Sequence, residues 1–331
     1  MTVALRCIIG GGEPMPQVLA GVQQRDLHTL PRDIQCQPGT PGEPTWGPGL
    51  CGSRIRRQYS LVLAVLLVLS SGGRAQAPPS VPAKAPYSPF ATVEEAEAFL
   101  HSAKVIQSKP LGGGVSGALK LLLDDGKIQH AAVFKDIDVH KKEVTVVKGV
   151  PETDFKDSWK YEVAAYRLDR LLGLNMVPVT VERKINDKQG SLQLWMDGCM
   201  NEARRLKVNP VPPNPLEWNR QMYKYHLFDN LVYNSDSNLG NALVTPDFLV
   251  FKIDHTRTFK NIAALSNTGH LVSFSRSLMQ ALEKVDKDDI KACCKNFLSS
   301  MEIDSLLKRG NLILRLYRRL VAEKGESILY P

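Results

Sequence analysis

Residues 228–259 read FDNLVYNSDSNLGNALVTPDFLVFKIDHTRTF, and this stretch decides how the rest of the chain is interpreted. Its pattern predicts the end of a helix, a polar loop, and two short apolar strands about a turn at residues 245–247. Asp236 and Asn241 stand five positions apart in the loop, and Asp254 follows the second strand. Three side chains able to bind a metal or accept a proton therefore lie at the ends of two short strands.

Phosphoryl transfer needs such a set of side chains: a carboxylate near the attacking hydroxyl, and an Asn with a second carboxylate to hold Mg²⁺ against the phosphates. Asp-x-x-x-x-Asn, then a strand, then another Asp, is the layout of kinases. Asp, Asn and Gly are also ordinary turn residues, so the loop could be a hairpin connection without a ligand. The choice depends on whether other phosphate-binding groups precede it in the chain.

A glycine-rich turn is the first such group. Residues 104–107 and 118–123 predict two strands, and Gly112, Gly114 and Gly117 form a G-x-G-x-x-G pattern between them. Backbone N–H groups approach phosphates closely where side chains are absent, as in the loop that covers the nucleotide in kinases. The alternative is a hairpin turn without a ligand.

A lysine and a glutamate follow in the order that a nucleotide site requires. Residues 128–136 predict a third strand that carries Lys135 near its end, and residues 159–173 predict a helix with Glu162 in its first turn. In kinases a strand lysine contacts the α- and β-phosphates and pairs with a helix glutamate. The alternatives are a solvated lysine and a favourable charge at a helix N-terminus.

The remaining pattern predicts an α+β, two-lobed, protein-kinase-like fold, with a small antiparallel-sheet lobe over 93–197 and a mainly helical lobe over 198–331. Asp197 and Gly198 form the expected hinge between the lobes. Further elements are expected as a helix at 92–100, a hairpin over 177–185 and 191–196, a Pro-rich connector at 209–215, and helices at 216–232, 273–285, 287–301 and 303–324.

The order of these motifs carries a resemblance. Residues 104–260 resemble the kinase-like fold of the HipA and phosphoinositide-kinase group, to which the secretory-pathway Golgi casein kinases and the CotH spore-coat kinases also belong. The run KYEVAAYRLDRLLGLNMVPVTVER, together with IDHTRTF, is most similar to uncharacterised bacterial members of that group. The resemblance covers about half of the chain and does not reach residues 1–92.

The resemblance implies a role for each residue of the nucleotide half of the site. Gly112, Gly114 and Gly117 would cover the triphosphate of ATP, Lys135 would hold the phosphates, and Glu162 would orient Lys135. ATP is therefore the expected cofactor, and the acceptor is a hydroxyl on a protein, a lipid or a small molecule.

The resemblance also assigns the catalytic and metal-binding residues. Asp236 would position the acceptor hydroxyl or accept its proton, while Asn241 and Asp254 would bind Mg²⁺ or Mn²⁺. Many relatives have Arg directly after the catalytic Asp, but this chain has Ser237, which loses a cation there. The leading hypothesis is an ATP-dependent atypical kinase; the alternatives are a catalytically silent pseudokinase or nucleotide-binding scaffold, and an AMP-transferring variant.

The N-terminal third has a different composition. Residues 1–53 are rich in Gly, Pro and Gln and predict a disordered segment or a mis-called upstream extension. Residues 54–77 join a basic flank, a short apolar run and small residues, the parts of a secretory signal peptide, and residues 78–92 predict a Pro/Ala linker. We expect export, secreted or periplasmic, if that signal operates, and a cytoplasmic protein otherwise.

Hydropathy and net charge limit the kinds of partner that we expect for this chain. The apolar run at 59–69 is shorter than the roughly 20 residues that a membrane-spanning helix needs, so no stable span is expected. The formal charge of +8 falls to about +5 without residues 1–77, which carry seven Lys/Arg and four Asp/Glu. This modest excess suits phosphate-bearing ligands. We expect no nucleic-acid partner, because the sequence shows no basic stripe interleaved with aromatic residues.

Overall fold

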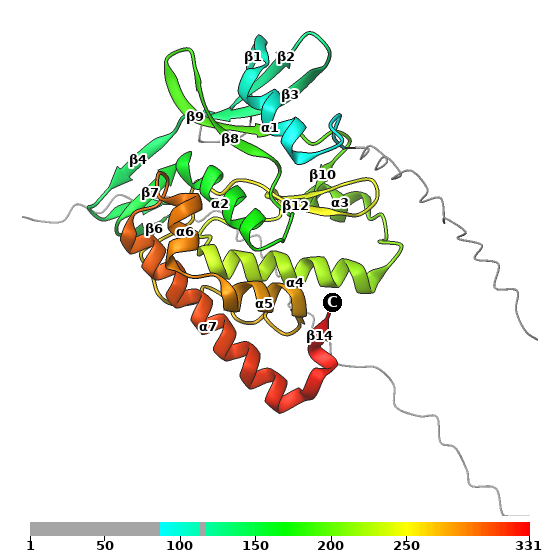
Figure 1. Cartoon of the computed structure of the whole chain (residues 1–331), viewed down its shortest axis with the longest axis vertical. Coiled ribbons are helices and arrows are strands. Elements are labelled where there is room, and N and C mark those ends of the chain that lie inside the picture. Colours follow the sequence, from blue (N-terminus) through cyan, green and yellow to red (C-terminus); the bar gives the residue numbers. More distant parts are fainter. Residues whose placement is uncertain (1–86, 113–116, 148) are drawn as a thin grey trace, which may run out of the picture. The chain divides into compact units, whose positions relative to one another are not determined.

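The computed structural model describes residues 87–112, 117–147 and 149–331 (Figure 1). The predicted upstream extension, signal peptide, most of the linker and Gly114 lie outside these ranges. Among the described helices, none combines the length and apolar character that crossing a membrane requires.

The first half of the fold is built on a five-stranded antiparallel sheet with the order β1-β2-β3-β9-β8. Side chains of the central strands alternate between the core and the opposite face, as a half-buried sheet requires: Leu121, Leu123, Ala132 and Phe134 are all buried. The strands are β1 (Lys104–Pro110), β2 (Leu119–Asp124), β3 (Gln129–Lys135), β8 (Thr180–Ile185) and β9 (Lys188–Leu194).

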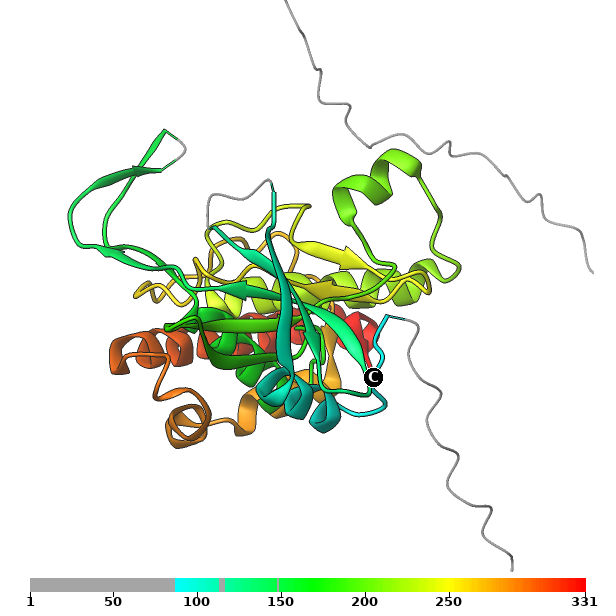
Figure 2. The same ribbon diagram turned by 90° about the horizontal axis from the view of Figure 1, so that it is seen from above.

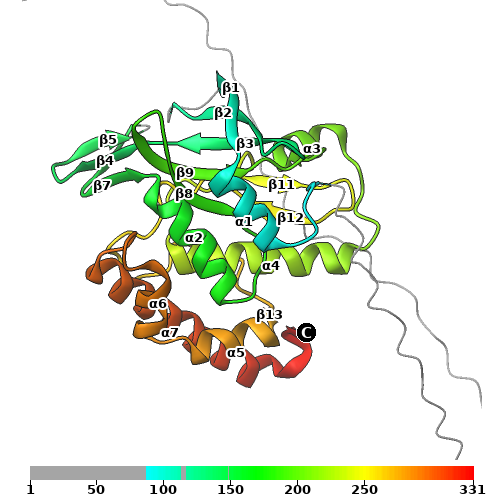
Figure 3. The same cartoon turned by 45° about the horizontal axis from the view of Figure 1, so that its top comes forward.

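Two helices pack against strands β8 and β9 of this sheet, α1 (Val93–Ser102) and α2 (Lys160–Leu171) (Figure 3). The side chain of Thr92 caps α1 by accepting from the Glu95 backbone N–H, which satisfies a donor that the helix itself cannot pair. The second helix has buried side chains around most of its circumference. Its N-terminus therefore sits firmly beside the sheet, and that turn carries Glu162.

A narrow arm, inserted between β3 and α2, was not expected from the sequence. It pairs β4 (Asp138–Lys141) with β7 (Phe155–Ser158), and β5 (Thr145–Val147) with β6 (Val150–Glu152). Figure 2 shows it reaching away from the sheet. Its valines are largely exposed, so the alternation of buried and exposed residues that marks a strand in sequence is absent.

The chain leaves the sheet after β9 and enters the second half through a small three-stranded sheet, β10-β11-β12. Its strands are β10 (Met200–Asn201), β11 (Ala242–Val244) and β12 (Val250–Lys252). Between β10 and β11 run the short helix α3 (Glu202–Val208) and the long helix α4 (Pro215–Val232), which ends at Tyr233. The loop that carries Asp236 therefore begins at the buried C-terminal end of α4.

Three further helices complete the helical half: α5 (Arg276–Lys284), α6 (Lys287–Cys294) and α7 (Ser300–Lys324). A 3₁₀ turn, η1 (Gly325–Ile328), leads to β14 (Leu329–Tyr330), which pairs in parallel with β13 (Phe274–Ser275). The single helix predicted over 287–301 is wrong. Ser299 and Glu302 form a reciprocal capping box that starts α7 and separates it from α6.

Helix α7 is bonded to both halves of the fold. In its first turn, Glu302 accepts from the Tyr161 hydroxyl at 2.6 Å and from Lys156 Nζ at 2.8 Å. Two turns later, the fully buried guanidinium of Arg309 donates to main-chain carbonyls, and burial lowers the pKa of Arg309 to about 10. Its acceptors, at 2.6 to 3.0 Å, are the carbonyls of Leu231, Lys260 and Ile262.

Candidate active site

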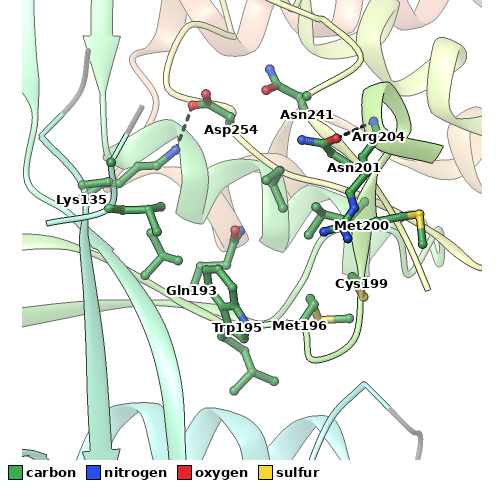
Figure 4. A pocket seen from close by; sticks show the side chains of 18 residues that line it. Lys135, Gln193, Trp195, Met196, Cys199, Met200, Asn201, Arg204, Asn241 and Asp254 are labelled. Carbon is green, nitrogen blue, oxygen red and sulfur yellow. Dashed lines mark hydrogen bonds and ion pairs between the residues drawn. The ribbon is translucent and has the colours of Figure 1, made fainter. Parts of the chain in front are cut away.

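A cavity of about 450 Å³ lies between the five-stranded sheet and the helical half (Figure 4). The sheet contributes Lys135 and Gln193, while the helical half contributes Asn201, Arg204, Asn241 and Asp254. Apolar side chains, including Trp195 and Met196, cover the rest of the wall. An apolar cavity with a few convergent polar groups is the usual form of a small-molecule site.

Lys135 lies at the end of β3, between two carboxylates. Its Nζ donates to Glu162 Oε1 at 2.5 Å and to Asp254 Oδ1 at 2.8 Å. The neighbouring strand must approach closely here, because a Cβ on Gly190 would collide with the Lys135 carbonyl oxygen. Burial lowers the pKa of Lys135, but attraction to the two carboxylates outweighs burial and raises it above its ordinary value. Lys135 is therefore a firmly held cation on the cavity wall.

Glu162, in the first turn of α2, is almost completely buried behind Lys135. Its second oxygen, Oε2, lies 3.4 Å from Nδ1 of His255, whose imidazole is fully buried. Burial alone raises the pKa of Glu162; Lys135 first and then His255 reverse this and lower the pKa below its ordinary value. His255 therefore gives Glu162 a second anchor, which the sequence did not predict.

The segment that begins at Asp254 is fixed by main-chain bonds on both sides. Asp254 has a positive φ of 64°, a conformation that is strained for a residue with a Cβ and persists only when its surroundings impose it. The Ile253 N–H donates to the Asn241 carbonyl at 3.0 Å, and the Ser158 N–H donates to the Thr256 carbonyl at 2.9 Å. These bonds hold the Asp254 carboxylate toward Lys135.

Asn241 lines the cavity from the helical half, as Asp254 does, and lies beside Asp254 in Figure 4. Its Nδ2 donates to the Asp236 carbonyl at 3.1 Å, so the amide oxygen is the atom that faces another partner. No group of three or more His, Cys, Asp or Glu side chains suited to a metal exists within the part of the chain that the structure describes. One carboxylate with one amide oxygen instead fits Mg²⁺, which takes few protein ligands and fills its shell with phosphates and water.

Asp236 is not part of the cavity wall; it lies in the loop beside it. Its backbone N–H donates to Asn234 Oδ1 at 3.0 Å, and its Oδ2 lies 3.3 Å from Nη1 of Arg257. Arg257 was not predicted as a site residue, because a single arginine leaves no spacing signal. Its position three residues after Asp254 was the only available indication.

Ser237 is an exposed loop residue that bonds to a buried ion pair. Its Oγ donates to Asp229 Oδ2 at 2.7 Å, and Asp229 Oδ1 lies 2.5 Å from Nζ of the fully buried Lys252. The same Nζ lies 3.8 Å from the centre of the Tyr225 ring. The residue at the position of the expected arginine therefore fixes the loop to α4.

The glycine-rich turn is described only in part. Gly112 lines the cavity, and a Cβ added there would meet no atom of the described residues within 4 Å. Gly117 has a φ of 62°, which favours glycine. Gly114 lies outside the described residues. Two of the three predicted glycines can thus be located, and one of them lies on the cavity wall.

Two further side chains near the cavity were missed by the sequence analysis. Asp157, at the end of β7, has an Oδ1 without a hydrogen-bond partner among the described residues, and burial, with the nearby charge of Asp254, raises its pKa. Cys199 lies on the cavity wall, where burial raises its pKa to about 11 and keeps the thiol protonated.

No protein-family model and no curated protein matches the sequence. Among solved structures, the Golgi casein kinase aligns with a TM-score of 0.51 at 13% identity, over 72% of this chain and 78% of that chain. The same kinase with Mn/ADP bound aligns with a TM-score of 0.52 at 13% identity, over 70% and 77%. The Helicobacter pylori proinflammatory kinase CtkA reaches only 0.42 at 11% identity, over 68% and 98%, which supports no conclusion.

These likenesses establish the fold. The chain has an α+β, kinase-like fold with a small antiparallel sheet and a mainly helical second half, so the predicted fold class is confirmed. At 13% identity the likeness extends to the fold alone. Membership of the HipA and phosphoinositide-kinase group, and the roles of the individual site residues, stay predictions.

Proposed function

We propose that this protein is an ATP- and metal-dependent phosphotransferase, an atypical kinase that transfers the γ-phosphoryl group to a hydroxyl. One observation carries the proposal: Lys135 lies between Glu162 and Asp254 on the wall of a 450 Å³ cavity, with Asn241 beside Asp254. A cation held by two carboxylates in this way is suited to phosphate oxygens. The fold, shared with a kinase, supports the same function.

In the proposed reaction, the acceptor oxygen forms a bond to the γ-phosphorus, the bond from that phosphorus to the β–γ bridging oxygen breaks, and ADP leaves. Asp236 positions the hydroxyl and accepts its proton. Lys135 holds the phosphates, Glu162 orients Lys135, and Asn241 with Asp254 holds Mg²⁺ or Mn²⁺. Gly112 and its neighbours in the turn cover the triphosphate. A bound metal supplies neutralisation of phosphate charge; the chain supplies position and a preorganised field.

The choice of nucleotide and metal also draws on the kinase structure that contains Mn/ADP. A nucleotide bound together with a metal ion would suit this chain too. Asp254 offers one carboxylate and Asn241 one amide oxygen, and the phosphates of the nucleotide would supply further ligands.

Binding and transfer are tested separately. A rise in melting temperature with Mn²⁺ and ATP measures binding, and label transferred from γ- or α-labelled ATP to a panel of proteins, lipids and small alcohols measures transfer. The proposal expects label from the γ position only. It expects Asp254→Asn to abolish that signal and Asp187→Asn, at a side chain that is 96% exposed, to leave it intact.

Other outcomes identify the alternatives. Binding without transfer assigns a nucleotide-binding scaffold, for which Ser237 in place of arginine is the sequence feature in favour. Label from the α position assigns an AMP-transferring enzyme. The absence of any thermal response to Mn²⁺ and ATP contradicts both the kinase and the scaffold.

Export belongs to the proposal as well, on the sequence of residues 54–77 alone. N-terminal sequencing of the protein recovered from its own cells tests it. A mature start after Ala75 or Ala77 supports export, whereas an N-terminus within residues 1–53 contradicts it. Export would require ATP in the compartment that receives the protein.

A further inference from the structure

The guanidinium of Arg257 contacts the proposed catalytic carboxylate and is held on three sides. Nη1 lies 3.3 Å from Asp236 Oδ2, and Nη2 donates to Glu152 Oε2 at 2.9 Å. The aromatic ring of Phe155 lies 5.1 Å from the guanidinium carbon. Only 11% of the side chain is exposed. This arginine therefore has little freedom to leave Asp236.

The main chains of the two loops are joined at the same place. Both the backbone N–H and the Oγ of Ser235 donate to the Arg257 carbonyl, at 3.4 and 3.0 Å. Two residues further on, the Phe259 N–H donates to the Val232 carbonyl at 2.6 Å. These bonds hold the two loops side by side and so bring the side chains of Arg257 and Asp236 within reach of each other.

Arg257 belongs to a cluster of ion pairs. Glu152, on β6, pairs with both Arg257 and Lys260, so Glu152 does not hold the arginine alone. The charge of Arg257 also favours the ionised form of Asp157. Without Arg257, the Asp236 carboxylate would lose the guanidinium that orients it.

We infer that Arg257 is the positioning residue of Asp236, and that it supplies from the Asp254 segment the cation that the loop lacks at Ser237. This rests on the proposed phosphotransfer. The arginine orients the carboxylate that receives the hydroxyl proton. It touches neither the nucleotide-binding lysine nor the residues proposed for the metal, so its removal affects the transfer step and spares nucleotide binding.

Arg309 shows what a purely structural arginine looks like in this fold. Its guanidinium donates to three main-chain carbonyls and is fully buried. Arg257 instead binds two side-chain carboxylates, one of which is the proposed proton acceptor. Arg318, which pairs on the surface of α7 with Glu283, gives a matched control for loss of an Arg–Glu pair.

The test compares Arg257→Ala, Arg257→Lys and Arg318→Ala in the full chain, with kcat and the KM for ATP from γ-label transfer and with the thermal shift in Mn²⁺/ATP. We expect Arg257→Ala to lower kcat about 30- to 100-fold, as a misplaced catalytic group does. The KM for ATP and the thermal shift should stay near those of the unmodified chain. The kcat of Arg257→Lys should lie between those of Arg257→Ala and the unmodified chain, because lysine keeps the charge and loses the planar, forked donors of the guanidinium. Added guanidinium ion should partly restore Arg257→Ala, and Arg318→Ala should match the unmodified chain.

Three results overturn the inference. The first is a kcat for Arg257→Ala that stays within about twofold of the kcat of the unmodified chain. The second is loss of the thermal shift in step with kcat in both variants, without rescue, which assigns a structural role. The third applies if Arg257→Ala does not fold. In that case, a kcat of Arg257→Lys that equals the kcat of the unmodified chain and does not respond to guanidinium overturns the inference. An unmodified chain that binds ATP and transfers no label overturns the proposed function itself, and the inference with it.

Discussion

Two buried lysines of this fold occupy similar positions and differ in what surrounds them. Lys135 ends β3 and Lys252 ends β12, and each pairs with a carboxylate from a helix, Glu162 or Asp229. The Lys135 side chain is 13% exposed and reaches a second carboxylate on the cavity wall. Lys252 has no exposed surface and lies against the ring of Tyr225.

The difference teaches how one chemical pair can serve two purposes. A buried lysine–carboxylate pair gives little net stability, because removing two charges from water costs about as much as their attraction returns. The two pairs differ in the third side chain that each contacts. Lys135 also pairs with Asp254, which is 42% exposed and faces the cavity. Asp229 instead accepts a hydrogen bond from Ser237 in the loop. The first arrangement presents a cation to a ligand, and the second holds a loop in place.

The largest expected effect separates the two lysines by activity. Lys135→Met removes the cation from the cavity, so γ-label transfer should fall by about 10³-fold, the scale of losing a preorganised electrostatic group, and the thermal shift with Mn²⁺/ATP should disappear. Lys252→Met, assayed at a temperature where it remains folded, should keep that shift. Equal losses in both variants would show that the cavity lysine has no special role.

The next effect separates them by stability. Lys252→Met leaves Asp229 buried without its cation and should lower the free energy of unfolding by about 3–5 kcal/mol, measured by urea denaturation. Adding Asp229→Asn removes the unpaired charge while keeping an acceptor for Ser237. The double variant should therefore recover at least half of the loss. No recovery would mean that packing, and not charge, is the origin of the effect.

A third buried carboxylate extends the comparison to one without a lysine. Asp169, at the end of α2, accepts from the Met176 N–H at 2.8 Å and lies 3.4 Å from Arg170, and burial raises its pKa to about 6. A raised carboxyl pKa means that the folded state binds the proton more tightly. Asp169 therefore stabilises the fold below its unfolded pKa of about 4, and this contribution is lost as pH rises toward 6.

Unfolding of the parent and of Asp169→Asn across pH 4–8 measures this contribution. Relative to the parent, the free energy of unfolding of Asp169→Asn should rise by about 2–3 kcal/mol between pH 4 and 7, and the difference should then stay constant. A pH-independent difference would show that Asp169 keeps its charge without penalty.

The smallest expected effect concerns Gly112, in the glycine-rich turn on the cavity wall. An added methyl at Gly112 meets no atom within 4 Å in the part of the chain that the structure describes, so Gly112→Ala should change the free energy of unfolding by no more than about 0.5 kcal/mol. If phosphates approach this backbone, the same variant should weaken ATP binding several-fold in a titration followed by thermal shift. Unchanged binding would remove Gly112 from the nucleotide site.

The sequence predicted those parts of the fold that bury one face. Strand β3 alternates buried and exposed side chains, and α2 shows helical spacing, so both were found from periodicity. The arm between them was missed because Val144, Val146 and Val150 are all exposed. The break between α6 and α7 depended on a capping box that competes with helical periodicity at Ser299.

The candidate site was predicted where residue types recur in a fixed order. That order identified Lys135, Glu162 and Asp254, and the structure joins these three side chains directly. It did not identify Arg257 or Lys252, because an isolated cation has no periodicity and its partners are set by loops that meet only in the folded chain. The absence of arginine at 237 was visible in the sequence, while Arg257, the substitute that we propose, was not.

The bonds of α7 have a consequence for synthesis of the protein. Arg309 supports the carbonyls of the segments before Asp236 and after Asp254, and Glu302 is bonded to Tyr161 near Glu162. A chain still on the ribosome lacks these supports until α7 has emerged. The proposed catalytic arrangement should therefore be fully supported only once α7 has been synthesised, and a product truncated before α7 is expected to be inert although it retains every proposed catalytic residue.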